Sequence, residues 1–287
     1  MKKSLYAAAV VLFGVSVSYA GESALNSLRA SVSPSVLSGT VVPEVSKGYV
    51  IGNDPSAGAP TKPVEWVSIS GGKFIMGTDE NIGVFEDAKP VHEVAIKTFD
   101  MSKTLVTVEQ YAECVIKGAC TEPNTSDYCN WGKPSRGSHP VNCVDWNQAQ
   151  AYAEFKGARL PSESEFEYAA TSGGKNEKYP WGNQETTSEL AVFNTDSTMP
   201  VCSKPNGNTA QGLCDMAGNV WQWVQDKYQD SYKGAPVDGS AFEGAGSYRV
   251  VRGSSFYIVV ASALRADRRN SGDPGSRYGG VGFRLAR

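Results

Sequence analysis

Six cysteines constrain the fold of this chain more than any other feature of its sequence. Four of them crowd a polar stretch rich in proline and glycine, and two bracket a later loop: Cys114, Cys120, Cys129, Cys143, Cys202 and Cys214. An even number of cysteines indicates disulfides when a chain is exported. Zinc is the alternative, but no CxxC motif occurs and the chain has only two histidines, His92 and His139. Of the fifteen possible pairings we favour the sequential one, 114 with 120, 129 with 143 and 202 with 214.

Residues 1–20 have the pattern of an export signal. Two lysines precede an apolar run from Leu5 to about Val17, and Ser18-Tyr19-Ala20 supplies the small residues that the cleavage enzyme reads. A membrane anchor is the alternative, but the run is short for about 30 Å of hydrocarbon, and no later segment approaches that length. We therefore predict a signal peptide over 1–20 and a periplasmic, secreted or cell-surface protein with no membrane span.

The remainder divides at about Pro63. Residues 21–62 are rich in Ser, Gly, Pro and Val without a helical period, which predicts an extended or disordered leader. Packing of this segment as an extra strand is the alternative. Residues 63–287 show no repeat and no further boundary, so we expect one domain there. The net charge of −3 and the lack of a basic run make nucleic acid an improbable partner.

Local patterns predict few regular elements in this domain. The sequence VEWVSISGGKFIMG alternates apolar and polar residues around Gly71-Gly72, which indicates a hairpin. A further strand should start at His92. Helical spacing occurs over 107–114, 145–156 and 163–171, with Asp145 as a cap and Gln148 three residues later. Beyond about Gly173 the chain is rich in loops.

Six phrases in order carry a family resemblance: SGGKFIMG (70–77), HPVNCVDWNQAQAYAEFKGARLPSESEFEYAA (139–170), YPWGN (179–183), GLCDMAGNVWQWVQD (212–226), RVVRGSSF (249–256) and VGFRLA (281–286). Together they resemble the formylglycine-generating-enzyme (sulfatase-modifying factor) family. The resemblance implies an α+β, loop-rich, C-type-lectin-like fold. In such a fold, Arg252, Arg265, Arg269 and Arg284 are expected to be buried clamps on carboxylates, because the guanidinium fork suits such pairs. Trp181, Trp221 and Trp223 are expected to fill space between loops.

The chemistry of the family's enzymes is missing from this sequence. By resemblance, two cysteines that bind copper should lie a few residues after the phrase RGSSF, but residues 257–287 contain no cysteine. Soft thiolates select copper(I), which Tyr, Val and Ser cannot replace. A branch that uses iron needs three imidazoles, and this chain has two. We therefore predict a non-catalytic ligand-binding protein that requires no cofactor. A copper-free exported oxidoreductase or tailoring enzyme, and a degenerate structural module, are the alternatives.

Residues 256–280 have an unusual composition. Every residue there can be encoded by a codon that ends in C, and Lys, Glu, Gln, Met and Trp are absent. A chance absence over this length is on the order of a per cent. The stretch resembles the variable proteins of diversity-generating retroelements, in which template AAC codons become randomised. Drift of a former active site is the alternative. The resemblance implies that the ligand, an unknown protein or surface, contacts these positions: Phe256, Tyr257, Ile258, Val259, Val260, Ser262, Asp267, Arg268, Asn270, Ser271, Gly272, Asp273, Gly275, Ser276, Tyr278, Gly279 and Gly280. Ser254 and Phe256 replace the usual Gly and Trp.

A calcium site is also implied by the resemblance. The side chains of Asp215 and Gln222 and the carbonyl groups of Gly218 and Val220 match it, and oxygen donors suit calcium. Gln222 replaces the usual Glu, which removes a charge and should weaken binding. We therefore expect a structural calcium ion at this site, bound more weakly than by a site with Glu at position 222.

Overall fold

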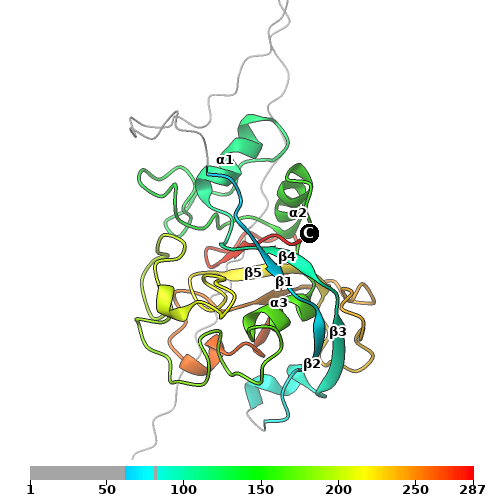
Figure 1. Ribbon diagram of the computed structural model, residues 1–287. Helices are drawn as coiled ribbons and strands as arrows, with labels where there is room; N and C mark the ends of the chain where they lie inside the picture. Colours follow the sequence, from blue (N-terminus) through cyan, green and yellow to red (C-terminus); the bar gives the residue numbers. More distant parts are fainter. Residues whose placement is uncertain (1–61, 81–82) are drawn as a thin grey trace, which may run out of the picture. The chain divides into compact units, whose positions relative to one another are not determined.

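The computed structural model describes residues 62–80 and 83–287 (Figure 1). The predicted signal peptide, 1–20, and the predicted leader, 21–62, lie outside these residues except for Lys62. Among the described residues, no helix is long and apolar enough to cross a membrane.

The N-terminal strands form a long, bent ribbon of two antiparallel segments. Strands β1 (Trp66–Ile69) and β2 (Gly72–Met76) pair with β4 (Phe99–Ser102) and β3 (His92–Ile96), respectively. Figure 1 shows that the two paired stretches of chain, 66–76 and 92–102, run side by side along one edge of the domain. The predicted hairpin at Gly71-Gly72 is therefore wrong. The backbone N–H of Gly71 donates to Thr98 Oγ1 at 3.0 Å, so this glycine pair bends the ribbon and does not reverse the chain.

The three predicted helices are present: α1 (Val108–Ile116), α2 (Trp146–Phe155) and α3 (Glu163–Ala170). Each begins with a capping box, in which the N-cap side chain and the side chain three residues later bond each other's backbone N–H groups. The pairs are Thr107 with Gln110, Asp145 with Gln148, and Ser162 with Glu165. Capping of this kind depends on neighbours in the sequence alone, which explains why the helix positions could be predicted.

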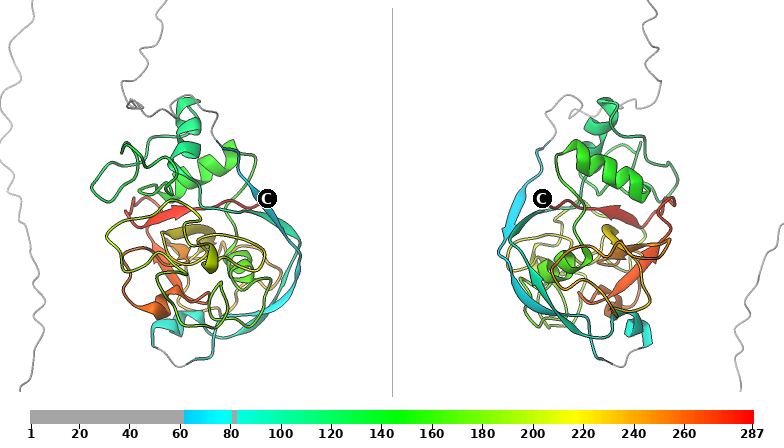
Figure 2. Two further views of the ribbon diagram at one scale, coloured as in Figure 1. Left: turned by 60° about the vertical axis from the view of Figure 1, so that its left-hand side comes forward. Right: turned by 90° about the vertical axis from the view of Figure 1, so that its right-hand side faces the viewer.

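A four-stranded sheet in the order β7-β6-β5-β8 lies at the centre of the C-terminal half. Strand β5 (Trp221–Lys227) pairs in parallel with β8 (Val281–Phe283) and antiparallel with β6 (Arg249–Arg252), which pairs with β7 (Arg269–Gly272). Short 3-10 helices interrupt the loops: η1 (Gly83–Ala88), η2 (Pro205–Gly207) and η3 (Ala261–Leu264). Figure 2 shows how much of the surrounding chain is irregular loop.

Two large apolar clusters fill most of the interior of the described residues, and a smaller third one contains Tyr179 and Leu264. One packs the ribbon against α3 through residues such as Phe74 and Phe166, and the other packs α1 and α2 against β5 and β8. Trp221 and Trp223 are buried as predicted, whereas Trp181 is half-buried and stacks on Tyr179 with ring centroids 5.0 Å apart. Large aromatic side chains therefore occupy space that regular backbone pairing leaves unfilled.

All six cysteines are paired, and the sequential pairing is confirmed: Cys114–Cys120, Cys129–Cys143 and Cys202–Cys214. Each disulfide closes a loop that has little regular structure of its own. Three disulfides indicate an oxidising compartment and not the cytoplasm.

Candidate functional site

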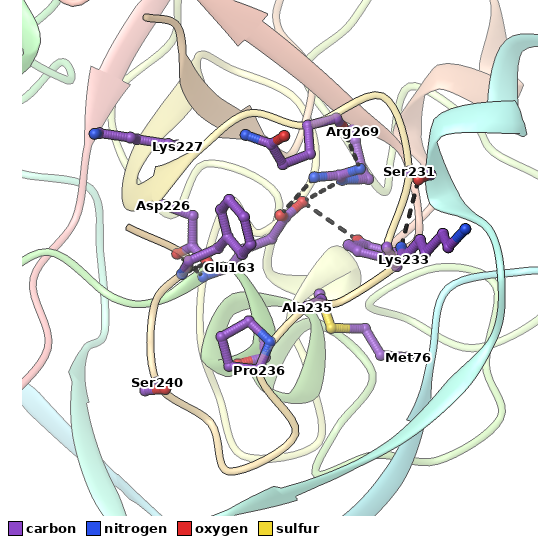
Figure 3. Close-up of a pocket in the computed structure, with 14 residues that line it drawn as sticks. Met76, Glu163, Asp226, Lys227, Ser231, Lys233, Ala235, Pro236, Ser240 and Arg269 are labelled. Atoms are coloured by element: carbon purple, nitrogen blue, oxygen red, sulfur yellow. Dashed lines mark hydrogen bonds and ion pairs between the residues drawn. The ribbon is translucent and has the colours of Figure 1, made fainter. Parts of the chain in front are cut away.

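Buried arginine–carboxylate pairs hold the C-terminal loops to helix α3. Arg252 contacts Glu163 and Glu167 with N–O distances of 2.6 Å each, and Arg269 forms a two-pronged pair with Glu163 at 2.7 and 2.9 Å. Figure 3 shows the Arg269–Glu163 pair beside the cavity that it lines. All four side chains are buried. The predicted clamp role of Arg252 and Arg269 is confirmed.

The charge of this cluster is fixed by its own members. Burial alone would raise the pKa of Glu163, but the guanidinium groups of Arg269 and Arg252 outweigh it and the pKa lies below the usual value. Asp226, which accepts backbone N–H bonds from Glu163 and Phe242, has its pKa raised to about 7 by burial and by the nearby charge of Glu163. These carboxyl groups are occupied in holding backbone and guanidinium groups together.

The cavity of Figure 3 is too small for an organic substrate. It is lined by residues that include Met76, Glu163, Asp226, Tyr232 and Arg269, and its water-accessible space is about 20 Å³. A single water molecule needs roughly 10–15 Å³ by the same kind of measure. The cavity is therefore a small space beside the clamp.

The other two predicted clamps differ from each other. Arg265 forms a two-pronged pair with Asp267 at 2.9 and 2.5 Å and reaches Glu80 at 2.7 Å, as expected. Arg284 instead donates to the carbonyl groups of Ser102 and Cys214 and to the amide oxygen of Gln222. The expectation of a carboxylate partner for Arg284 is wrong, because the side chain that it contacts is the amide of Gln222.

Both histidines have structural surroundings. His139 Nδ1 lies 2.9 Å from Thr198 Oγ1 and 3.0 Å from Arg136 Nη1, and burial followed by the charge of Arg136 lowers its pKa to about 4. Because a guanidinium can only donate, Nδ1 must accept and the ring must be neutral. His92 Nδ1 lies 3.1 Å from the carbonyl oxygen of Pro90.

The residues present do not fit the family's copper ion. Every cysteine is in a disulfide, and none follows Phe256. Within the described part of the chain, no group of three or more His, Cys, Asp and Glu side chains is placed to hold a metal ion. The side chains that follow Phe256 are Tyr257, Ile258, Val259 and Val260, which offer no soft ligand.

The guanidinium group of Arg284 lies among the predicted calcium donors and already binds one of them. The Gln222 amide oxygen lies 2.5 Å from Arg284 Nε, and its amide nitrogen donates to the Asp215 carbonyl. Asp215 itself accepts the Cys202 N–H at 2.8 Å, and burial raises its pKa. The buried guanidinium thus already uses one of the four oxygens and supplies a positive charge near Asp215. This donor set does not fit calcium well, and calcium binding stays a prediction.

Most of the seventeen predicted ligand-contact positions reach the surface. Tyr257, Val259, Val260 and Tyr278 are 51%, 69%, 60% and 40% exposed, which is unusual for such apolar side chains. The other positions that are exposed or half-buried are Ile258, Ser262, Arg268, Asn270, Ser271, Asp273, Gly275, Ser276 and Gly279. The framework residues between them, Arg265 and Arg269, are buried. Buried arginines and exposed intervening residues therefore alternate over 257–271, whereas the later framework residues Pro274 and Arg277 are half-buried and exposed.

Four of the predicted contact positions are buried, so they are corrected here: Phe256, Asp267, Gly272 and Gly280. Phe256 is 2% exposed, and Asp267 is bound to Arg265. A Cβ atom added to Gly272 would lie 2.6 Å from Cη2 of buried Trp223, and one added to Gly280 would strike the ring of Tyr257. Codon type does not encode burial, which is why the sequence could not separate these four from the rest.

One surface residue of this region escaped the sequence patterns. Tyr128 is 67% exposed, and a Cβ atom added to Gly279 would lie 2.7 Å from the Tyr128 Cβ. It precedes Cys129 by one residue and lies about 150 positions before Gly279. The only signal in the sequence was an aromatic residue within a polar, disulfide-closed loop.

The fold and these motifs define a loop-rich α+β domain of C-type-lectin-like type, as predicted. The family profile described as the sulfatase-modifying factor enzyme 1-like domain matches residues 53–287. The chain belongs to this family. It is 31% identical to the formylglycine-generating enzyme of Streptomyces coelicolor in an alignment 279 positions long, which covers 77% of this chain and 88% of that protein.

A second curated relative is larger. The serine/threonine-protein kinase pkn1 of Chlamydia caviae is 34% identical over 243 residues, which cover 78% of this chain and 38% of that protein. The chain therefore spans well under half the length of that relative. Relatives include enzymes and also a protein named inactive C-alpha-formylglycine-generating enzyme 2, from Bos taurus, which is 28% identical with 78% of this chain and 88% of that protein covered.

Two solved structures have the same fold. PvdO from Pseudomonas aeruginosa superposes with a TM-score of 0.67 at 31% identity, covering 77% of this chain and 93% of that one. Variable protein 1 of Treponema denticola superposes with a TM-score of 0.59 at 21% identity, covering 77% and 94%. The second likeness shows that the scaffold of a variable protein and the scaffold of this chain are the same fold.

Proposed function

We propose that this domain is an exported, non-catalytic protein whose C-terminal loops bind a protein ligand and are diversified to do so. The observation that carries the proposal is the exposure of Tyr257, Val259, Val260 and Tyr278 on a framework that is buried and clamped by arginines. Exposed apolar side chains gathered on one stretch of a soluble domain usually mark a contact site. A rigid scaffold with tolerant loops is the arrangement in which binding variation costs little stability.

The charge of the exposed stretch favours a protein ligand. Its exposed and half-buried charged side chains are Arg268, Arg277 and Asp273. Both arginines are paired with carboxylates, Arg268 with Asp87 at 3.8 Å and Arg277 with Asp145 at 3.0 Å, so the stretch carries little uncompensated charge. Such a face is complementary to a neutral, partly apolar protein surface and offers nothing to a polyanion. A periplasmic, secreted or cell-surface location follows from the export pattern and agrees with the three disulfides.

A copper-free tailoring enzyme is the alternative, and a larger cavity among the described residues could hold a small substrate. A cavity of about 560 Å³ is lined by residues that include Glu80, Glu167, Lys178 and Asp267. Three of the four carboxylates that line it, all but Glu177, are paired, however: Glu167 accepts from Arg252 and from the Gly77 N–H, and Asp267 and Glu80 accept from Arg265. A general base must be available to take a proton, and these groups are already engaged. The geometry therefore favours the ligand-binding function.

The proposal is tested at the level of the gene. A near-copy of the coding stretch for 256–280, with AAC codons at the exposed positions and a reverse transcriptase gene beside it, is the expected finding. Sequencing the stretch in many isolates should show changes at Tyr257, Val259, Asn270 and Tyr278, with Arg265 and Arg269 constant. Lack of a template copy, together with changes spread evenly over buried and exposed positions, would overturn the diversification proposal.

A further inference from the structure

The face proposed to bind the ligand includes an exposed aromatic side chain from outside the variable stretch. We define the tyrosine face as Tyr128, Tyr257 and Tyr278, which surround the Gly279–Gly280 backbone. Cβ atoms built at Gly279 and Gly280 meet Tyr128 and the Tyr257 ring, respectively. The three tyrosines are between 40% and 67% exposed.

The backbone of Tyr128 is locked to the variable stretch by a buried asparagine. Asn142 donates its side-chain N–H groups to the carbonyl oxygens of Tyr128 and Gly279 and accepts the Asn130 N–H at 2.7 Å. Its side chain is fully buried, so these bonds are not shared with bulk water. The next residue, Cys143, donates its backbone N–H to the carbonyl of Tyr278 at 3.1 Å.

The Cys129–Cys143 disulfide links the loop of Tyr128 covalently to the segment that carries Asn142. It joins the residue after Tyr128 to the residue after Asn142, with a Cα–Cα distance of 5.6 Å. The loop that carries Tyr128 therefore keeps its place next to Tyr278 and Gly279 when side chains of the variable stretch other than residue 279 change. A side chain at Gly279 would strike Tyr128, so this glycine has to stay constant. Pre-organisation of this kind reduces the ordering cost of binding.

We infer that Tyr128 is a constant anchor of the ligand-binding face, and that the partner is a folded protein surface. This inference rests on the proposed function and adds a residue that diversification does not touch. Small molecules bind in concave sites that bury most of the ligand. The three tyrosines stand half in solvent, so a broad partner surface is needed to cover them together. Tyrosine offers a large contact area at a low entropic cost, which suits an anchor that must serve many partners.

The test uses a display library of this domain with lysozyme as the probe. Tyr257, Val259, Val260, Asn270 and Asp273 are randomised in the Tyr128 background, and independent binders are then given the substitution Tyr128→Ala. We expect a loss of affinity of tenfold or more in most binders, with Tyr128→Phe retaining most of it. Ile75→Ala is the matched control, because Ile75 is 60% exposed on the separate β2–β3 sheet; it should change affinity less than twofold.

The outcomes separate the two proposals. If binders arise and Tyr128→Ala changes their affinity less than twofold while they remain folded, the anchor inference is overturned and the binding face stands. If no clone binds lysozyme better than the unchanged domain, the proposed function fails and the anchor inference fails with it. Unchanged melting temperatures of the Tyr128→Ala clones confirm that an affinity loss is not a loss of fold.

Discussion

At the scale of single residues, the structure indicates that Ser254 lowers the stability of the folded domain. Ser254 stands where the family usually has Gly, and its φ of 67° lies in the left-handed region. The side chain is fully buried and its hydroxyl has no hydrogen-bond partner among the described residues. A left-handed non-glycine residue costs roughly 1–2 kcal/mol, and an unpaired buried hydroxyl adds to that cost.

We therefore expect Ser254→Gly to stabilise the domain by about 1 kcal/mol, or about 2–4 °C in melting temperature at this size. Ser255→Gly is the matched control. Ser255 is equally buried and its hydroxyl is also unpaired, but its φ is not left-handed, so the same exchange should lower the melting temperature. Equal shifts of the two variants in a thermal melt would rule out backbone strain at Ser254.

His139 should make the domain sensitive to mild acid. Its pKa is lowered to about 4 in the folded protein. Between pH 6.5 and 4 the imidazole is therefore protonated in the unfolded chain but stays neutral in the folded one. Stability is therefore present above pH 6.5 and is lost as the pH falls toward 4. The substitution His139→Asn keeps an acceptor for Arg136 and removes the titration. Melting curves from pH 7.5 to 4 should show a steeper decline for the unchanged protein, and parallel declines would contradict this account.

At the scale of elements, local signals in the sequence were informative and non-local ones were not. Helical spacing located α1, α2 and α3, and the Asp145–Gln148 cap marked the start of α2, because every participant of such a signal lies within a few residues. The hairpin prediction failed because the partner of β2 is β3, about twenty residues further on, and the Gly71-Gly72 pair bends against Thr98. Within 256–280, the family resemblance identified the framework arginines but not the burial of Gly272 against Trp223.

The division of this stretch into surface and core predicts opposite responses to substitution. The triple exchange of Tyr257, Val259 and Val260 to Ser should change the free energy of unfolding little, since exposed substitutions usually stay within about 0.5 kcal/mol each. Gly272→Ala should cost about 1–3 kcal/mol, because its Cβ meets Trp223 and overpacks the core. Chemical denaturation of both variants measures the difference. A larger loss in the triple variant would show that Tyr257, Val259 and Val260 belong to the core.

At the scale of the whole molecule, the scaffold of the family is retained, but no cysteine follows Phe256. The fold class followed from motif resemblance, because the order of six phrases identifies the family even where periodicity is weak. The chain has little regular secondary structure, and its loops are held in place by the three disulfides and by the Arg252–Glu163–Arg269 cluster. The position of Tyr128 beside Gly279 could not be predicted, since it depends on a contact between segments about 150 residues apart.

The last prediction concerns catalysis by the whole protein. Copper(I) in this family requires a pair of thiolates, and here every cysteine is held in a disulfide elsewhere in the fold, while Ile258 and its neighbours follow Phe256. We expect no conversion of a sulfatase-type cysteine peptide to formylglycine after incubation with copper, reductant and oxygen, as measured by peptide mass. The formylglycine-generating enzyme of Streptomyces coelicolor serves as the positive control under the same conditions. A second assay after mild reduction of the disulfides covers the possibility that a released thiol binds copper, and the folded state is checked in parallel. Copper-dependent turnover in either assay, with the domain still folded, would show that this scaffold holds the metal by residues other than a cysteine pair after Phe256.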